Sequence, residues 1–539
     1  MQMHSTMMHT PMTVQVIMQY GARVFPDSTI GIFDGEVVQH STYAEVATDA
    51  SRLANALKSL GVASGDRVGT FSWNNRAHMK AYLAIPSMGA IMHTVNIRLA
   101  PEEIAYVINH AEDKVIILDA SLRDIFAPVV PLLKTVEHIL VFGEAQALPD
   151  IDTSDYATLV AEQTDSFDWP EIDETAAAAI CYTSGTTGHP KGVVYSHRTT
   201  FLHSMASRAT DTFGICERDR VLLLPPMFHA NAWGFPYAGW MSGSDFVLPG
   251  PHVQLDGLKK MIASEAPTMT AMVPTVLGDL LAAGDDAGLD MSSFRMIVCG
   301  GSAVPEVMIE SARTRWDVSV LQGWGMTETS PLCALSHPPR APEPEGELYW
   351  RTKSGRPVSG VQVRVVDDAG DEVPHDGQSV GELQLKGTWI TGSYYRDESP
   401  ESFTEDGWLR TGDIGHIDER YYTHLTDRTK DVIKSGGEWI SSVDLENELL
   451  AHPKVAEAAV VATPDERWQE RPLAVIVRNE DSLTAQELQE FLRDRVAKFW
   501  IPEYWSFVSE IPLTSVGKID KKSLRLAREK GELAVDYVR

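Results

Sequence analysis

Capped helical stretches that each lead into a short apolar run are the feature that most limits the fold of this chain. Thr42 and Glu45 form a helix-start signature, and the apolar run 68–72 follows that helix. The pair repeats at 101–111 and 115–118, where the second run is apolar throughout. A strand without a polar face belongs in a sheet that helices cover on both sides. The chain is therefore predicted to have an α/β fold.

The second half of the chain has a different pattern. From residue 361 apolar residues alternate with polar ones, which predicts a small barrel or an antiparallel layer. After Asp427 a helix at 442–450 is followed by two strands, a helix beginning after Thr484 and a further strand. A chain of 539 residues is too long for one core. We therefore predict an N-terminal domain at 1–427 and a C-terminal α+β domain at 428–539.

The stretch 182–192 concentrates hydroxyls, glycines and one lysine in a turn-prone segment. Gly185 and Gly188 let the backbone turn back, so that its N–H groups and the charge of Lys191 can meet an anion. The spacing is not that of a Walker P-loop, because Pro190 precedes the lysine and a glycine follows it. The segment predicts a phosphate-binding loop, with a Gly/Thr-rich surface turn as the alternative.

Composition excludes several classes of partner. A formal net charge of −29 argues against binding to nucleic acid or to an anionic membrane surface. The four cysteines have neither CxxC nor His/Cys spacing, so we expect them to be reduced and mostly buried. No run approaches the length of a membrane span, and the Met-rich start lacks the features of a signal peptide. We therefore expect a cytoplasmic protein whose anionic substrates are attracted by local charge.

Six further motifs follow the loop along the chain, and they occupy residues 226–233, 300–303, 323–328, 406–413, 427–431 and 512–518. Together with the loop, this series resembles the adenylate-forming superfamily, which includes acyl-CoA synthetases, luciferases and the adenylation domains of peptide synthetases. The resemblance extends from the helix at Thr42 to Lys522. It implies a large N-terminal domain of α/β layers with a small β-barrel, followed by a small mobile C-terminal α+β domain.

The resemblance implies an ATP-dependent acid–CoA ligase that forms an acyl-adenylate. Attack of a carboxylate on the α-phosphate brings anions together, so the site needs placed cations and N–H donors. The implied catalytic residues are His229, Thr327, Glu328 and Lys518, and the implied Mg²⁺ ligands are Thr187 and Glu328. For Glu328 the alternative is an acid that balances a helix dipole. The residues implied in ATP and AMP binding are Thr183, Ser184, Gly185, Thr186, Thr187, Gly188, Lys191, Gly301, Ser302, Ala303, Gly323, Trp324, Gly325, Met326, Thr327, Asp413 and Arg428.

Several of these residues have a more specific implied role. Asp413 and Arg428 correspond to ribose-binding positions, and Trp324 stands where the family usually carries a tyrosine that stacks on adenine. Lys518 is implied to drive adenylation as a point charge, and Lys430 to be the hinge of the C-terminal domain. The alternatives are a surface ion pair for Asp413 with Arg428, core packing for Trp324 and a solvated basic cluster for Lys518.

The resemblance also implies how the acid and coenzyme A are bound. The implied CoA-binding residues are Ser435, Gly436, Gly437, Glu438 and Trp439, and the expected acyl-pocket residues are Trp233, Gly234, Gly300, Met326 and Pro331. Trp233 resembles a gate tryptophan of bacterial fatty-acyl-CoA synthetases. The motifs of this chain are most similar to those of bacterial short- and medium-chain acyl-CoA synthetases, including 3-methylmercaptopropionate-CoA ligases. We therefore expect 3-methylthiopropionate as the acid, and a homodimer.

Three other functions stay open on the residues alone. They are an adenylating enzyme that loads a separate carrier protein, a luciferase-like oxygenase and a non-catalytic nucleotide-binding relative. One residue departs from the family pattern, because Arg420 before Tyr421 replaces the glycine of an Asp-x-x-Gly-Tyr turn. We expect the geometry of that turn to differ.

Overall fold

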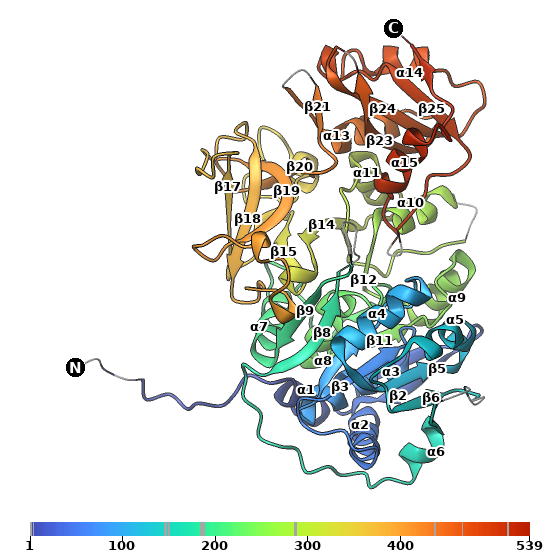
Figure 1. Cartoon of the computed structure of the whole chain (residues 1–539), viewed down its shortest axis with the longest axis vertical. Helices are drawn as coiled ribbons and strands as arrows, with labels where there is room; N and C mark the ends of the chain where they lie inside the picture. The colour runs from blue at the N-terminus through green and yellow to red at the C-terminus, as the bar shows by residue number, and fades with distance from the viewer. Residues whose placement is uncertain are drawn as a thin grey trace. The chain divides into compact units, whose positions relative to one another are not determined.

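A computed structural model describes residue 3 and residues 5–144, 148, 151–183, 189–284, 288–435, 438–465, 467–514 and 517–538. The chain divides into two compact units (Figure 1). Unit 1 comprises residues 1–270, 326–332 and 393–399, and unit 2 comprises residues 271–325, 333–392 and 400–539.

Unit 1 contains a seven-stranded sheet in the order β7-β6-β5-β3-β4-β8-β9, parallel except for the β8–β9 pair. The bounds are β3 Arg67–Phe71, β4 Ile91–Thr94, β5 Asp113–Asp119, β6 His138–Phe142, β7 Thr153–Asp155, β8 Ala177–Tyr182 and β9 Gly192–Ser196. Residues 115–118 of β5 are all buried, which confirms the strand predicted from its lack of a polar face. The parallel order confirms the α/β prediction.

A second sheet begins in unit 1 with the strand order β12-β10-β11-β1-β2. The bounds are β1 Thr29–Phe33, β2 Val38–Thr42, β10 Arg220–Leu222, β11 Asp245–Leu248 and β12 Met269–Met272. β1 pairs in parallel with β11 and antiparallel with β2. Asn74, which lies after β3, donates from its amide to the carbonyls of Leu223 and Pro225 at 2.8 and 2.9 Å, and so links the ends of the two sheets.

Helices surround these sheets in unit 1, coloured blue to green in Figure 1. Their bounds are α1 Val14–Val24, α2 Tyr43–Ser59, α3 Arg76–Ser87, α4 Pro101–Ala111, α5 Arg123–Phe126, α6 Tyr156–Ala161, α7 His197–Ser207, α8 Phe235–Ser242 and α9 Leu255–Glu265, with 3₁₀ turns η1 Ala120–Leu122, η2 Ala127–Leu132, η3 Ala230–Gly234, η5 Thr327–Thr329 and η6 Tyr395–Asp397. The predicted start of α2 is confirmed, since Thr42 and Glu45 form a capping box. Tyr43 stacks on Trp240 of α8 with ring centroids 3.9 Å apart, and both residues are fully buried.

Unit 2 contains the parallel pair β13 (Met296–Gly300) and β14 (Ser319–Gly325), with helices α10 (Pro274–Ala282) and α11 (Glu306–Trp316). β15 (Leu332–Leu335), which begins in unit 1, pairs antiparallel with β16 (Arg356–Pro357), and α12 covers Glu347–Arg351. The alternating region is a four-stranded antiparallel sheet of β17 Val361–Val366, β18 Gly381–Gly387, β19 Leu409–Ile417 and β20 Thr423–Arg428, with the short turn η7 Pro400–Ser402. The antiparallel layer predicted from residue 361 onward is therefore present.

The C-terminal residues of unit 2 build an α+β arrangement, as predicted. Its strand order is β22-β21-β24-β25-β26, and β23 also pairs with β24. The bounds are β21 Ile433–Ser435, β22 Glu438–Ile440, α13 Ser442–Leu450, β23 Val455–Asp465, β24 Gln469–Arg478, α14 Ala485–Leu492, η8 Lys498–Trp500, β25 Tyr504–Val508, α15 Lys521–Glu529 and β26 Asp536–Tyr537. Apolar residues of α13 and α14 form one buried cluster with this sheet, and Leu524 of α15 joins a second.

The turn at residues 418–422 corrects one prediction. The Asp418 carboxylate accepts hydrogen bonds from the backbone N–H groups of Arg420 and Tyr422, both at 2.9 Å, and this fixes the register of the turn. The left-handed residue is Tyr421, with φ 67°, so assigning the glycine position to Arg420 was wrong by one residue. Arg420 instead donates from its guanidinium to the carbonyl of Ala341 at 2.7 Å.

None of the helices in the described part of the chain is long and apolar enough to cross a membrane. Of the four cysteines, Cys181, Cys299 and Cys333 are buried with free thiols, and Cys216 is exposed.

Candidate functional site

The predicted phosphate-binding loop connects β8 to β9 in unit 1. Its neck is closed by a pair of hydrogen bonds, in which Thr183 N–H donates to the Lys191 carbonyl at 2.9 Å and Lys191 N–H donates to Thr183 Oγ1 at 3.1 Å. Lys191 therefore lies directly before β9 with its backbone held at a defined place. The predicted loop residues Ser184, Gly185, Thr186, Thr187 and Gly188 lie outside the described residues.

A tight turn at residues 326–331 carries the predicted catalytic pair Thr327 and Glu328, both buried. The Met326 N–H donates to the Pro331 carbonyl at 3.2 Å, which closes the turn. Tyr195 of β9 donates from its hydroxyl to the Thr327 carbonyl at 2.6 Å. The turn that carries the two catalytic candidates is thus hydrogen-bonded to the strand that follows the predicted phosphate loop.

The Glu328 carboxylate supplies oxygen ligands that suit a magnesium ion bound together with a nucleotide. No group of three or more His, Cys, Asp or Glu side chains that could hold a metal is found among the described residues. Mg²⁺ in nucleotide sites is typically held by one or two carboxylates together with substrate phosphate oxygens and water. Glu328, with phosphates supplied by ATP, therefore fits the implied ion.

The turn η3 has an unusual backbone. Ala230, Asn231, Ala232 and Trp233 have φ between 42° and 57°, and Gly234 has φ 79°. A left-handed conformation costs about 1–2 kcal/mol for each non-glycine residue, so such runs persist only where their surroundings enforce them. The predicted catalytic residue His229 precedes the run and accepts from Ala232 N–H through its carbonyl at 3.1 Å. The run turns Asn231 inward, where its side-chain oxygen accepts from Cys181 Sγ at 3.2 Å.

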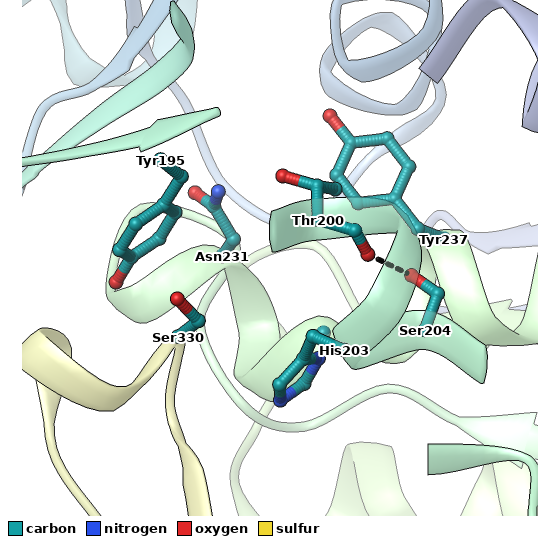
Figure 2. A pocket seen from close by; sticks show the side chains of 8 residues that line it. Tyr195, Thr200, His203, Ser204, Asn231, Tyr237 and Ser330 are labelled. Atoms are coloured by element: carbon teal, nitrogen blue, oxygen red, sulfur yellow. Dashed lines mark hydrogen bonds between the residues drawn. The ribbon is translucent and has the colours of Figure 1, made fainter. Parts of the chain in front are cut away.

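Figure 2 shows a pocket beside this run, lined by Tyr195, Thr200, His203, Ser204, Asn231, Gly234, Tyr237 and Ser330. Gly234 belongs to the predicted acyl pocket, and Ser330 is the neighbour of the predicted Pro331. Trp233 precedes Gly234, is half-buried and is not among the residues that line this pocket. A Cβ at position 234 would lie 2.4 Å from His203 Cε1, so only glycine fits there.

His203 of α7 is a pocket residue that the sequence did not predict. Burial lowers the pKa of His203 to about 3, so the ring is neutral near pH 7. Its Nε2 atom accepts a hydrogen bond from Leu332 N–H at 3.2 Å, which fixes the tautomer with the proton on Nδ1. His203 therefore places a neutral, polar ring edge against Gly234.

The predicted adenine-binding residues lie at the carboxyl ends of β13 and β14 in unit 2. Gly300 pairs with Gly323 in the register of these parallel strands, and Gly301 and Trp324 are the next residues. Ligands of open α/β sheets bind outside the carboxyl ends of the strands. Gly301 has φ 91°, which favours glycine. Of the other predicted residues nearby, Ser302 is exposed and Ala303 and Gly325 are half-buried.

Trp324, Asp413 and Arg428 form one hydrogen-bonded group. The Trp324 indole N–H donates to Asp413 Oδ2 at 2.9 Å, and Arg428 Nε lies 2.6 Å from Asp413 Oδ1. The Asp413 side chain is 6% exposed, whereas that of Arg428 is 42% exposed. The structure therefore brings together the predicted ribose and adenine residues, with Asp413 orienting both of its neighbours.

The predicted catalytic lysine stands on a tight turn in the same unit. Thr514 N–H donates to the Lys518 carbonyl at 2.7 Å, and Lys518 N–H donates to Thr514 Oγ1 at 3.2 Å. The side chain of Lys518 passes over Gly301, because a Cβ at position 301 would lie only 3.2 Å from Lys518 Cε. Gly301 thus leaves the space that brings Lys518 to the end of β13.

The predicted hinge and CoA residues follow β20. Lys430 is an exposed residue of a turn in which Arg428 accepts from Asp431 N–H at 2.8 Å. Ser435 is buried, and its hydroxyl oxygen accepts from Arg471 Nη1 at 3.1 Å. Gly436 and Gly437 lie outside the described residues, and of Glu438 and Trp439 only the backbone, in β22, is described.

Comparison with known proteins identifies the family to which this chain belongs. Residues 18–395 match the AMP-binding enzyme family, and residues 444–518 match the AMP-binding enzyme C-terminal domain. A 3-methylmercaptopropionyl-CoA ligase from Ruegeria lacuscaerulensis is 40% identical over 529 residues, which cover 96% of this chain and 98% of the relative. A long-chain-fatty-acid–CoA ligase from Thermus thermophilus is 45% identical over 533 residues, which cover 97% and 96%.

Solved structures show the same fold. The anthranilate CoA ligase AuaEII in complex with anthranoyl-AMP has a TM-score of 0.87 and 26% identity, covering 96% of this chain and 98% of that chain. ATP-bound MatB from Rhodopseudomonas palustris has a TM-score of 0.81 and 25% identity, covering 96% and 99%. The order of the motifs, the α/β fold and these matches show that the chain belongs to the AMP-binding enzyme family of adenylate-forming proteins, as an AMP-forming acyl-CoA ligase.

Proposed function

We propose that this ligase activates a short- or medium-chain carboxylic acid, with 3-methylthiopropionate as the first candidate. Two relatives named 3-methylmercaptopropionyl-CoA ligase, from Ruegeria lacuscaerulensis and Ruegeria pomeroyi, are 40% and 41% identical to it. The acid would react with ATP to give an acyl-adenylate and pyrophosphate. Coenzyme A would then displace AMP and form the thioester.

The observation that carries this choice of acid is the similarity to the two Ruegeria ligases, and the pocket beside η3 adds a limit on size. The room in it is about 10 Å³, which is about that of one water molecule and far below the range of about 300–1,000 Å³ usual for small-molecule sites. Seven of its eight lining residues have polar side chains, and several of these are hydrogen-bonded within the chain, such as Tyr195 to the Thr327 carbonyl and Tyr237 to the Tyr82 carbonyl. A short acid with a polarizable thioether suits so small a space better than a long alkyl chain does.

In the adenylation step, the proposed roles divide between the two ends of ATP. The loop from Thr183 to Lys191 would hold the outer phosphates, and Thr327 would contact the α-phosphate. Glu328, with Thr187, would hold Mg²⁺, which supplies charge compensation for the phosphates when bound. Asp413 and Arg428 would hold the ribose, and Lys518 would place its charge on the transferring group.

In the thioester step, residues 435–439 would guide coenzyme A, and residues 428–539 would turn about Lys430 as a separate domain. The contacts around the turn set a condition for this motion. Asp427, before the hinge, accepts a hydrogen bond from Ser442 N–H at 2.9 Å. Ser441, also after the hinge, donates to the Thr426 carbonyl at 2.7 Å. A rotation confined to Lys430 must break both hydrogen bonds.

This proposal has two alternatives, a longer acid and an acceptor other than coenzyme A. The 45% identity to the Thermus long-chain-fatty-acid–CoA ligase favours a longer acid. Transfer to a separate carrier protein in place of coenzyme A is the alternative reading of the same adenylate chemistry. A panel of acids, assayed both for pyrophosphate release and for loss of the CoA thiol, separates these functions. Pyrophosphate release without thiol loss would favour a carrier protein.

Acid length gives a prediction for Trp233, which precedes the pocket glycine. Each buried methylene adds about 0.8 kcal/mol only while the pocket has room. We expect activity to peak for acids with about three to six heavy atoms beyond the carboxylate. Trp233→Ala should raise kcat/KM for octanoate about tenfold relative to 3-methylthiopropionate, by opening space beside Gly234. Steady-state kinetics with both acids measures this ratio.

The matched control is Trp169→Ala, which removes a half-buried tryptophan ring that packs on Phe167 elsewhere in unit 1. It should leave the ratio unchanged, and the KM for ATP should be unaltered in both variants. A preference of the unmutated enzyme for palmitate would reject the short-acid proposal, as would an equal loss on all chain lengths in Trp233→Ala. A cytoplasmic homodimer stays a prediction from the sequence.

A further inference from the structure

Tyr394 connects two groups of unit 1 that the proposed function places on the phosphates of ATP. Its hydroxyl donates to Glu328 Oε1 at 2.6 Å, across 66 residues of sequence. Its ring lies under the Lys191 ammonium group, with Nζ 4.9 Å from the ring centroid. Tyr394 is 7% exposed and Glu328 is 6% exposed. Tyr394 therefore contacts both the proposed metal ligand, Glu328, and the lysine proposed to bind phosphate, Lys191, and the Tyr394 and Glu328 side chains are shielded from bulk water.

The hydroxyl contact restricts the Glu328 carboxylate. A hydrogen bond to an ionised carboxylate is short and stronger than one between neutral groups. A carboxylate has about four lone-pair sites, so one hydrogen bond at Oε1 orients the group and still leaves sites for a cation. Groups that hydrogen-bond a metal ligand commonly set its orientation, and their loss weakens metal affinity. Since Glu328 is the one carboxylate of the two protein ligands proposed for Mg²⁺, its orientation matters more than in a site with several carboxylates.

The ring contact acts on the other group. A cation over an aromatic face is attracted by about 0.5–1 kcal/mol at exposed sites and by more when it is desolvated. Lys191 is fixed at its backbone by the Thr183 hydrogen bonds, so the ring restrains only the end of its side chain. Loss of the ring should therefore weaken phosphate binding whether or not a metal is present.

The segment that carries Tyr394 is fastened by contacts with α4 and with Glu112, the residue that follows α4. Arg396 pairs with Glu112 at 2.7 Å, and Glu398 pairs with His110 Nε2 at 3.2 Å. The Tyr395 ring packs edge-on against His110 with centroids 5.4 Å apart. These contacts hold residues 394–398 on the end of α4, so Tyr394 is presented by a fixed support.

We propose that Tyr394 is a positioning residue for the nucleotide site, whose hydroxyl orients Glu328 for the metal and whose ring steers Lys191 to the phosphates. This inference rests on the proposed function, because that function assigns Glu328 and Lys191 to Mg²⁺ and phosphate. Its two parts are separable. Tyr394→Phe removes the hydroxyl and keeps the ring, whereas Tyr394→Leu removes both.

The test is calorimetric binding of a non-hydrolysable ATP analogue, α,β-methylene-ATP, with Mg²⁺ and with EDTA. Tyr394→Phe should lower the affinity with Mg²⁺ about tenfold and leave the affinity in EDTA unchanged. Tyr394→Leu should lower the affinity in both conditions. Equal affinities of wild type and Tyr394→Phe with Mg²⁺, or an equal loss in both conditions, would overturn the metal-orienting role.

Two controls keep the result interpretable. Tyr395→Phe removes the neighbouring hydroxyl, which hydrogen-bonds Arg396 and raises the pKa of that guanidinium, and it should bind like wild type. In a double-mutant cycle, Tyr394→Phe should add no further loss when Glu328 is already Gln. If the wild type shows no acid-dependent pyrophosphate release, the proposed function fails. The metal dependence of nucleotide binding still decides the role of Tyr394.

Discussion

Replacing Lys518 by alanine should lower the rate of acyl-adenylate formation by about 100- to 1,000-fold, the usual loss for one preorganised electrostatic contact to a transition state. The ammonium group would be needed only while charge builds on the phosphorus oxygens. Conversion of supplied acyl-adenylate and coenzyme A to the thioester should therefore stay near the wild-type rate. ATP–pyrophosphate exchange measures the first step, and chromatography of the acyl-CoA formed measures the second.

Lys522→Ala is the matched control, since Lys522 is an exposed lysine four residues further on in α15. It should leave both steps unchanged, which separates a placed charge from a general basic surface. Normal exchange in Lys518→Ala would remove Lys518 from the adenylation step. Equal losses in both half-reactions would show that the change disturbs the turn at Thr514 and not a specific charge.

Replacing Asp413 by alanine should raise the KM for ATP about 100-fold. Two effects combine, because the variant loses a carboxylate proposed to bind ribose and also leaves the buried Trp324 N–H without its partner. A buried donor without a partner costs about 1–3 kcal/mol, so the free energy of unfolding should also fall by about that amount. Initial-rate kinetics and denaturant unfolding measure the two effects separately.

Asp406→Ala provides the comparison for this carboxylate. Asp406 pairs at 2.8 Å with Arg364 of β17, a strand of the antiparallel sheet that also contains Asp413, but the Asp406 side chain is 58% exposed. An exposed ion pair contributes about 0–1 kcal/mol, so this variant should change neither stability nor the KM for ATP appreciably. An unchanged KM in Asp413→Ala, with stability lost, would leave Asp413 a purely structural role in orienting Trp324 and Arg428.

Helices with strong start signals could be predicted almost to the residue. The stretch 101–111 begins with Pro101, and 442–450 follows the capping hydroxyl of Ser441, and both match α4 and α13. These signals are local, since a proline at the first position and a hydroxyl at the cap satisfy the backbone of the same turn. The β-strand alternation from residue 361 onward is equally local, because side chains of a strand alternate between faces.

The contacts that complete the candidate site are not local. Tyr394 meets Glu328 across 66 residues, and His203 meets Leu332 across 129. Neither spacing belongs to a helix or strand period, so no pattern in the sequence relates these residues. The turn at Tyr421 was misplaced for a different, local reason. Counting Asp-x-x-Gly-Tyr from Asp418 puts the glycine position at Tyr421, and the Asp418 carboxylate fixes that register.

The left-handed run at residues 230–234 narrows the ways in which this chain can diverge. Four of its five residues are not glycine, and β-branched side chains tolerate that backbone least. Valine, isoleucine and threonine are therefore unfavourable at Ala230 and Ala232, although both positions are buried. At Trp233 the same limit favours glycine, asparagine or an unbranched side chain. Only a few substitutions in this segment could then change the selectivity for the acid. Conservation of these residues would reflect the backbone geometry as much as the chemistry of the site.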